Sequence, residues 1–247
     1  MNDFDISIVI PAFIAGLLIL LTHVPLGIKV LARGIIFADL AVAQIAGLGV
    51  IIAGLAGYAE QPVIVQFIAV ISALLGALLL SWIEHFLPEV REASIGLLFV
   101  LAASGGILLM SHDTHAGEHL KDLLVGQILW VSNTQLIVTA ILSAAILTLW
   151  ILWRDKLSTL GFYALFALAV TASVQLVGVY LVFASLIIPA LATHKFNNKR
   201  MVFAYATGAA GYAAGLLLSV TLDLPTGAAI VWAMALVGAL VIFSKRK

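Results

Sequence analysis

Three of the six histidines in this chain stand close together, as His112, His115 and His119. Their i, i+3 and i+7 spacing would bring all three to one face of a helix, and Glu118 adds a carboxylate beside them. Neutral imidazole together with carboxylate suits zinc or another borderline divalent ion. Gly117 weakens a helix here and the set does not match a closed structural zinc site, so a hydrated polar loop is the alternative. The pattern makes these three histidines and Glu118 candidate metal ligands.

A second candidate is Asp39, which lies more than one turn inside the apolar stretch GIIFADLAVAQIAG. An ionisable group at membrane depth is costly and usually faces a cavity or a pathway. Gln44, five residues on, is offset by about 140° on a helix of ~3.6 residues per turn, so it only partly shares that face. The alternative is that Asp39 is hydrated near the membrane surface and pairs with Arg33. Asp39 and Gln44 are therefore candidate pathway residues.

The stretch EHFLPEVRE carries a third group of charges, in which Pro88 should end a helix. Its mixed charges suit the docking of a soluble partner, and a solvated turn is the alternative. The candidate docking residues are Glu84, Glu89, Arg91 and Glu92.

The composition defines the setting of these residues. The 247-residue chain is 64% hydrophobic and only 10% charged, whereas charged residues make up about 25% of a soluble domain. Its apolar runs reach roughly 20 residues, the length of a membrane-spanning helix, and they lack the alternation of a membrane β-barrel. The sequence predicts an all-α, polytopic transmembrane bundle of eight or nine helices, some short or broken, as one domain over residues 1–247.

Charges and turn residues bound the expected helices. These lie near 6–24, 35–57, 62–84, 94–111, 134–153, 200–222 and 226–244. The range 159–193 is too long for one span and short for two, and it contains Gln175 and Gly178, which indicates two short or broken helices. With nine crossings, eleven of the twelve basic residues face one side. The positive-inside rule then predicts a cytoplasmic C-terminus, an external N-terminus and external histidines.

Small residues recur at helix-contact spacing, as in Gly211 and Gly215. A GxxxG pair permits close approach of two backbones. The pattern favours packing within the chain, and a dimer interface is the alternative.

Several classes of function find no support in the sequence. There are no cysteines, which excludes disulfides and thiolate metal sites. There is no GxxxxGK[ST], HExxH or GxSxG, so neither a P-loop nor these hydrolase motifs are present. The net charge is zero and the basic residues form no stripe with aromatics, which argues against nucleic-acid binding.

Three parts of the chain resemble the metal-uptake permease family of ABC importers. They are PLGIKVLARGIIFADLAVAQIAGLG (25–49), then EASIGLLFVLAASGGILLMS (92–111) followed by LLVGQILWVS (123–132), and VGVYLVFASLIIPALATHKF (177–196). The last is the most specific, and with the closing helices the resemblance covers nearly the whole chain.

The resemblance implies a bundle that forms a homodimer around a central pathway. It also implies that an extracytoplasmic metal-binding protein delivers the ion and that a separate cytoplasmic ABC ATPase drives transport. Asp39 matches the family's pathway aspartate. Two departures are visible: Ala43 stands where the family usually has histidine, and the cytoplasmic segment after Trp153 is short.

The expected function is thus the permease subunit of a bacterial inner-membrane importer for zinc or manganese. The chain is expected to be a transport subunit, not an enzyme, with the metal as substrate and no permanent cofactor. Two alternatives are a gradient-driven transporter or channel without an ATPase and a membrane sensor or scaffold that binds metal without transporting it.

Overall fold

The computed structural model describes residues 6–111, 124–153, 156–196 and 199–244. Within these ranges the chain forms eight α-helices. Each is long and apolar enough to cross a membrane, α2 when its π-helical continuation to Tyr58 is included, so the predicted helical transmembrane bundle is confirmed. The helices are α1 (Ile6–Arg33), α2 (Ala38–Ala53), α3 (Pro62–Phe86), α4 (Arg91–Leu109), α6 (Asn133–Trp153), α7 (Thr159–Ala192), α8 (Arg200–Leu222) and α9 (Thr226–Ser244). Short helical turns are the π-helix η1 (Gly54–Tyr58) and the 3₁₀-helices η2 (Pro88–Val90) and η3 (Ile128–Trp130).

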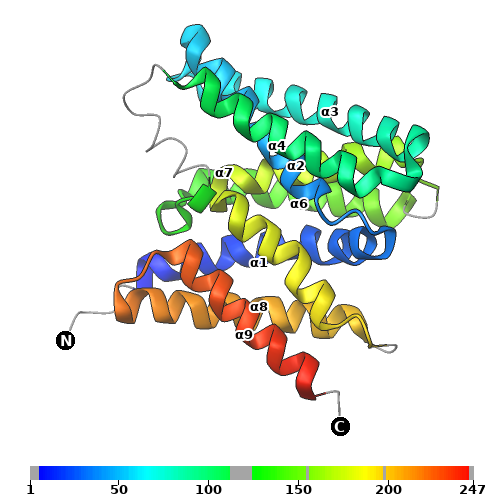
Figure 1. Cartoon of the computed structure of the whole chain (residues 1–247). Helices are drawn as coiled ribbons and strands as arrows, with labels where there is room; N and C mark the ends of the chain where they lie inside the picture. The colour runs from blue at the N-terminus through cyan, green and yellow to red at the C-terminus, as the bar shows by residue number, and fades with distance from the viewer. Residues whose placement is uncertain (1–5, 112–123, 154–155, 197–198, 245–247) are drawn as a thin grey trace.

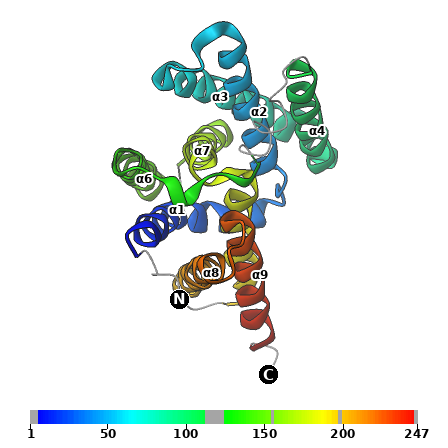
Figure 2. The same cartoon turned by 90° about the vertical axis from the view of Figure 1, so that its left-hand side faces the viewer.

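Helix α7 is the centre of the bundle. It packs against α1, α2, α3, α6, α8 and α9, and α3 with α4 lie at one edge while α8 with α9 lie at the other (Figures 1 and 2). Most of its residues are buried, in agreement with a sequence that is apolar on every face. The other helices each expose one side, which suits contact with lipid.

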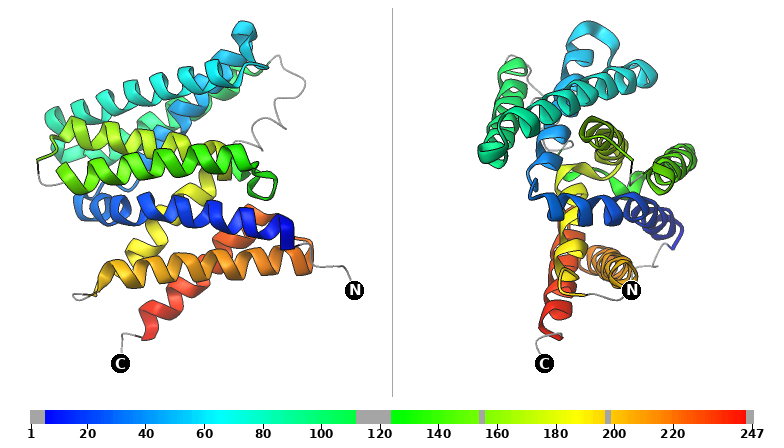
Figure 3. Two further views of the ribbon diagram at one scale, coloured as in Figure 1. Left: turned by 180° about the vertical axis from the view of Figure 1, so that it is seen from behind. Right: turned by 90° about the vertical axis from the view of Figure 1, so that its right-hand side faces the viewer.

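Helix α7 is broken at Gly178, as the sequence predicts for 159–193. The backbone there has φ 78° and ψ 165°, a conformation open essentially to glycine alone. Beyond the break, the second half turns back toward the end of the bundle at which the first half begins (Figures 1 and 3). The single element therefore supplies two of the nine predicted segments.

Gly178 meets Gly126 across this break, backbone against backbone. A Cβ added to Gly178 would lie 2.7 Å from the carbonyl oxygen of Leu124, and one added to Gly126 would overlap the Val177 backbone. Gly126 itself has φ 68°. The segment before α6 can thus pack directly against the break in α7, because neither Gly126 nor Gly178 carries a side chain.

The nine segments alternate in direction, so basic residues collect at one end of the bundle. Here α1 ends, α4 and α8 begin, and α6 is joined to α7 (Figure 1). We call this the basic end, and its residues include Arg33, Arg91, Lys156 and Arg200. The opposite end holds η1, η3, the break at Gly178 and the turn between α8 and α9.

The prediction that the first helix ends near residue 24 is wrong, because α1 continues to Arg33 through Pro25. Membrane helices tolerate internal proline when neighbouring groups satisfy the freed backbone. Gly27 explains why the extension packs: a Cβ there would overlap the backbone carbonyl of Leu186 in α7.

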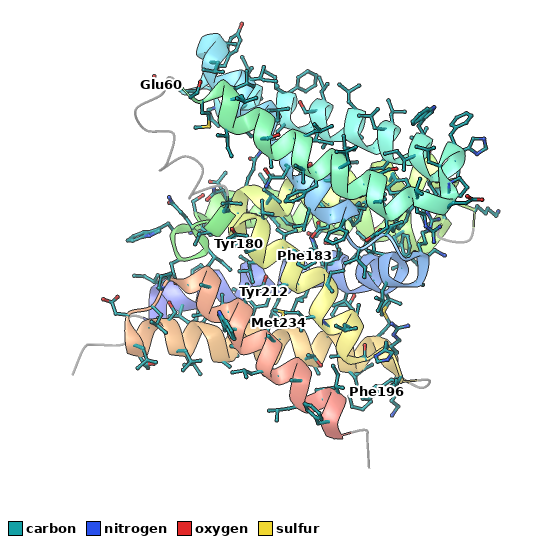
Figure 4. All side chains as sticks on the ribbon, in the orientation of Figure 1. Glu60, Tyr180, Phe183, Phe196, Tyr212 and Met234 are labelled. Carbon is teal, nitrogen blue, oxygen red and sulfur yellow. The ribbon has the colours of Figure 1, made fainter. Side chains whose placement is uncertain are left out.

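The GxxxG pair packs within the chain, as predicted. A Cβ on Gly211 would lie 2.7 Å from the Met234 Cα, and one on Gly215 would lie 2.7 Å from the Ile230 amide nitrogen. Tyr212, between the two glycines, places its hydroxyl 2.8 Å from that of Ser185 in α7. Figure 4 shows Tyr212 and Met234 close to the crossing of these helices.

We therefore expect Gly215→Leu to separate α8 from α9 and to destabilise the fold by about 3 kcal/mol, because the close approach leaves no room for a side chain. The measurement is the thermal unfolding midpoint in detergent. Ala228→Leu on the exposed side of α9 is the control and should leave the midpoint unchanged. Equal midpoints for both variants would contradict this packing.

Candidate functional site

Asp39 is held inside the protein. The prediction that Asp39 stands more than one turn inside its helix is wrong, because α2 begins at Ala38 and not near residue 35, which leaves Asp39 in the first turn. Only 1% of its surface is exposed, and α2 packs against α3, α4 and α7. Neither carboxylate oxygen has a hydrogen-bond partner among the described residues. Arg33 forms its ion pair with Glu84, at 3.6 Å, and not with Asp39. The carboxylate is thus buried without a partner in the part of the chain that the structure describes.

Gln44 lies further along the same helix and is only partly buried. Nowhere in the described ranges do three His, Cys, Asp or Glu side chains come together to hold a metal ion. Asp39 is therefore a single buried carboxylate and not part of a preformed cage within those ranges.

The predicted metal ligands His112, His115, Glu118 and His119 lie outside the described residues.

The predicted docking residues divide into two kinds. Glu84 and Glu92 face the connection between α1 and α2: Glu84 pairs with Arg33, and a Glu92 carboxylate oxygen accepts a hydrogen bond from the Phe37 amide at 3.1 Å. Arg91 is also partly buried, whereas Glu89 is exposed on η2. Glu84 and Glu92 thus link the turn between α3 and α4 to the connection between α1 and α2, whereas Glu89 faces outward.

Arg33 has a second contact at the place where the α1–α2 and α3–α4 connections meet, which we call the junction. Its guanidinium lies 4.2 Å from the ring centre of Phe162 in α7. Its side chain and that of Glu84 are 21% and 18% exposed, so the pair is screened less than a surface pair. Arg33 therefore links α1, α3 and α7 at the basic end.

We expect Glu84→Gln to lower the free energy of unfolding by about 1–2 kcal/mol, between the values typical of exposed and buried pairs. Arg33→Gln should cost more, because it also removes the contact with Phe162. Thermal unfolding in detergent measures both, and Glu89→Gln is the matched exposed control. A midpoint for Glu84→Gln equal to that control would show that the pair does not hold the junction.

His23 is a buried polar residue that the sequence analysis did not single out. It lies in α1 with no exposed surface. Its Nδ1 is 3.0 Å from the Ile19 carbonyl oxygen, and its Nε2 has no partner among the described residues. The sequence could have drawn attention to His23, because it is the one histidine in an otherwise apolar run. The hydrogen bond to its own helix explains its burial structurally, so it is not assigned to the pathway.

The comparison with protein families matches residues 5–245 to the ABC 3 transport family. Among curated relatives, the manganese transport system membrane protein MntC of Halalkalibacterium halodurans is 29% identical over 72% of this chain and 69% of its own length. The high-affinity zinc uptake system membrane protein ZnuB of Buchnera aphidicola is 24% identical over 91% of this chain and 93% of its own.

A third relative is a probable iron transport system membrane protein of Haemophilus influenzae, 30% identical over 57% of this chain and 60% of its own length. That match spans less than two thirds of the relative. Among solved structures, PsaBC from Streptococcus pneumoniae in complex with Fab superposes with a TM-score of 0.78 at 20% identity, over 97% of this chain and 92% of that one. The two proteins share this fold.

Proposed function

Because the chain belongs to the ABC 3 transport family, we propose that it is the membrane permease subunit of an ABC-type importer for a divalent metal ion. The observation that carries the proposal is Asp39, a buried carboxylate without a partner among the described residues. Such a group at membrane depth is costly and usually serves a path for cations. In this proposal the metal is the substrate, Asp39 lines the path, Gln44 borders it, and no cofactor is permanently bound.

For the metal we propose zinc first and manganese second. Relatives are named for manganese, iron and zinc. The imidazole and carboxylate groups at 112–119 suit zinc, and a carboxylate such as Asp39 suits manganese as well. His112, His115, Glu118 and His119 would take the ion from a metal-binding protein outside the membrane, so replacing the three histidines together should slow uptake.

The proposal includes a separate ABC ATPase in the cytoplasm and a second copy of this chain. The basic end is the docking side for the ATPase. At the turn between α3 and α4, the exposed Glu89 stands among the exposed apolar residues Phe86, Leu87 and Val90. Glu84 and Glu92 support this turn, because they bond to Arg33 and to the Phe37 amide, and Arg91 lies partly buried next to Glu92.

In a membrane, this arrangement has the basic end in the cytoplasm, following the positive-inside rule. The C-terminus is then cytoplasmic and the N-terminus lies outside the cytoplasmic membrane of a bacterium. Accessibility of single cysteines introduced at Glu60 and Glu89 tests this, since the chain has no other cysteine. An impermeant thiol reagent added to intact cells should label position 60 and spare position 89.

One observation favours a second candidate function. Only the residues between Trp153 and Thr159 join α6 to α7, although the family's longer segment at this place is expected to couple to the ATPase. A transporter driven by an ion gradient needs no such coupling. The third candidate, a sensor or scaffold, would bind metal without moving it.

Metal uptake into proteoliposomes separates these candidates. The vesicles contain this protein with or without the ATPase of its own system, and the metal-binding protein is added outside with zinc or manganese. Uptake that requires ATP supports the importer. Uptake without ATP would favour the gradient-driven transporter, and metal binding without flux would favour the sensor.

A further inference from the structure

A cavity of about 580 Å³ opens at the end of the bundle opposite the basic end. We propose that it is an entry subsite that holds a hydrated divalent metal ion; this inference rests on the proposed function. Its walls come from α2 with η1, the start of α3, the end of α4, the segment before α6, and α7 just before its break. The lining includes Ile51, Met110, Gln127, Trp130, Gln135 and Gln175.

Three amide side chains line this otherwise apolar cavity. Gln127, Gln135 and Gln175 come from three separate segments and all are exposed. Gln135 is held in place, since its side-chain oxygen accepts hydrogen bonds from the amide and the hydroxyl of Ser132 at 2.9 and 3.0 Å. Because that oxygen already has two donors, Gln135 forms part of the wall and is not a ligand. The side-chain amide oxygens of Gln127 and Gln175 have no hydrogen-bond partner among the described residues; such oxygens accept hydrogen bonds from water bound to a metal ion and also coordinate hard cations directly.

The ends of two helices give the cavity a further preference for cations. The lining takes Met110 from the end of α4 and residues 174–176 from the end of the first half of α7, whereas Gly54 and Leu55 belong to η1, which continues α2. The C-terminal end of a helix carries partial negative charge on its last carbonyl groups. Broken membrane helices use such ends to bind cations.

Two helices also begin beside the cavity, but their ends are already satisfied. The Gln135 amide donates to the Ser132 hydroxyl at 3.2 Å, and the Val65 amide donates to the Gln61 carbonyl oxygen at 3.1 Å. These N–H groups are therefore not presented to an anion. The lining contains no charged side chain.

The size and chemistry fit an ion that still holds its water. At ~30 Å³ for each water molecule, six waters fill about 180 Å³ of a cavity of about 580 Å³. Neutral ligands bind such an ion weakly, which lets it pass on toward the carboxylate of Asp39. A pathway needs sites that admit an ion and also release it.

Trp130 provides a direct probe, because its side chain lines the cavity and is 76% exposed. Co²⁺ quenches tryptophan fluorescence at short range. In purified protein with His112, His115 and His119 replaced by alanine, we expect saturable quenching by Co²⁺ that disappears in Trp130→Phe. Removing those histidines ensures that the signal does not come from them.

Gln175→Leu and Gln127→Leu should each raise the apparent Kd for Co²⁺ about 5-fold, the usual effect of one lost polar contact. Gln175→Glu should lower it, which tests the site even if a leucine variant does not fold. Gln66→Leu in α3, outside the lining, is the matched control and should have no effect. Quenching that rises without saturation, or that ignores all the Gln175 and Gln127 variants, would overturn the subsite.

This test does not depend on transport. A saturable Co²⁺ site without metal uptake would contradict the proposed permease and leave the subsite standing. ATP-driven uptake without a saturable Co²⁺ site would support the proposed permease and contradict the subsite.

Discussion

Asp39→Asn is expected to reduce metal uptake about 100-fold in proteoliposomes that contain the ATPase. Asparagine keeps the size and one oxygen of the side chain but removes the charge that attracts a divalent ion. A contact to a charged group contributes about 1.5–3 kcal/mol, and a loss of ~2.7 kcal/mol corresponds to a 100-fold change in rate. Asp39→Glu, which retains the carboxylate, should keep a measurable part of the uptake.

The same substitution should not harm the fold. Asp39 is buried and its oxygens have no partner among the described residues, so its charge costs free energy that asparagine avoids. We expect the unfolding midpoint of Asp39→Asn in detergent to equal or exceed that of the wild type. The corresponding gain in the free energy of unfolding is at most about 3 kcal/mol. Greater stability with lost activity is typical of a functional group kept at a cost.

Asp223→Asn is the control for this experiment. It makes the same chemical change at an exposed position at the end of α8, where φ is 53° and asparagine is tolerated. Uptake should be unaffected. If Asp39→Asn transports metal normally, Asp39 does not line the path. If it loses both uptake and stability, its role is structural.

The sequence predicted most of the helices because charges and turn residues mark their ends. The expected ranges 134–153, 200–222 and 226–244 agree with α6, α8 and α9 to within one residue. The end of α1 was missed because Pro25 and Lys29 are usual signs of a helix end. What carries the helix on is a contact with Leu186, far away in the chain, which no local pattern reveals.

The candidate site was only partly predictable for the same reason. Asp39 stood out because a carboxylate in an apolar run is visible in the sequence alone. That Arg33 pairs with Glu84 and not with Asp39 depends on the packing of both α1 and α3 against α7. Gln127 stands between two predicted helices and Gln135 at the polar start of the second, so neither attracts notice in the sequence. Only the break in α7 brings their segments beside Gln175 around one cavity.

Gly178→Ala is expected to have the largest effect on the fold, a loss of about 4 kcal/mol or more. Two costs add at this position. The backbone conformation, with φ 78° and ψ 165°, costs a residue with a Cβ about 1–3 kcal/mol. The new Cβ would also lie 2.5 Å from the Val125 carbonyl carbon and 2.7 Å from the Leu124 carbonyl oxygen, and such overpacking costs about 1–3 kcal/mol more.

Two other glycines separate these costs when each is changed to alanine. Gly96 lies inside α4 with open space around its Cβ position, so alanine should stabilise the helix by up to about 1 kcal/mol. Gly57 has φ 87° and likewise open space, so alanine there should cost only the backbone strain. Unfolding midpoints in detergent should therefore fall in the order Gly96→Ala, wild type, Gly57→Ala, Gly178→Ala.

The midpoint of Gly178→Ala relative to that of Gly57→Ala shows whether the break in α7 depends on the contact with Gly126 or on the backbone turn alone. A midpoint well below that of Gly57→Ala would mean that the contact with the segment at Gly126, and not the backbone turn alone, holds the two halves of α7 in place. Equal midpoints would mean that this segment moves aside easily, and the cavity beside Gln175 would then lack a fixed wall. Because the same contact forms that wall, Gly178→Ala protein that remains folded should also show weaker Co²⁺ quenching of Trp130.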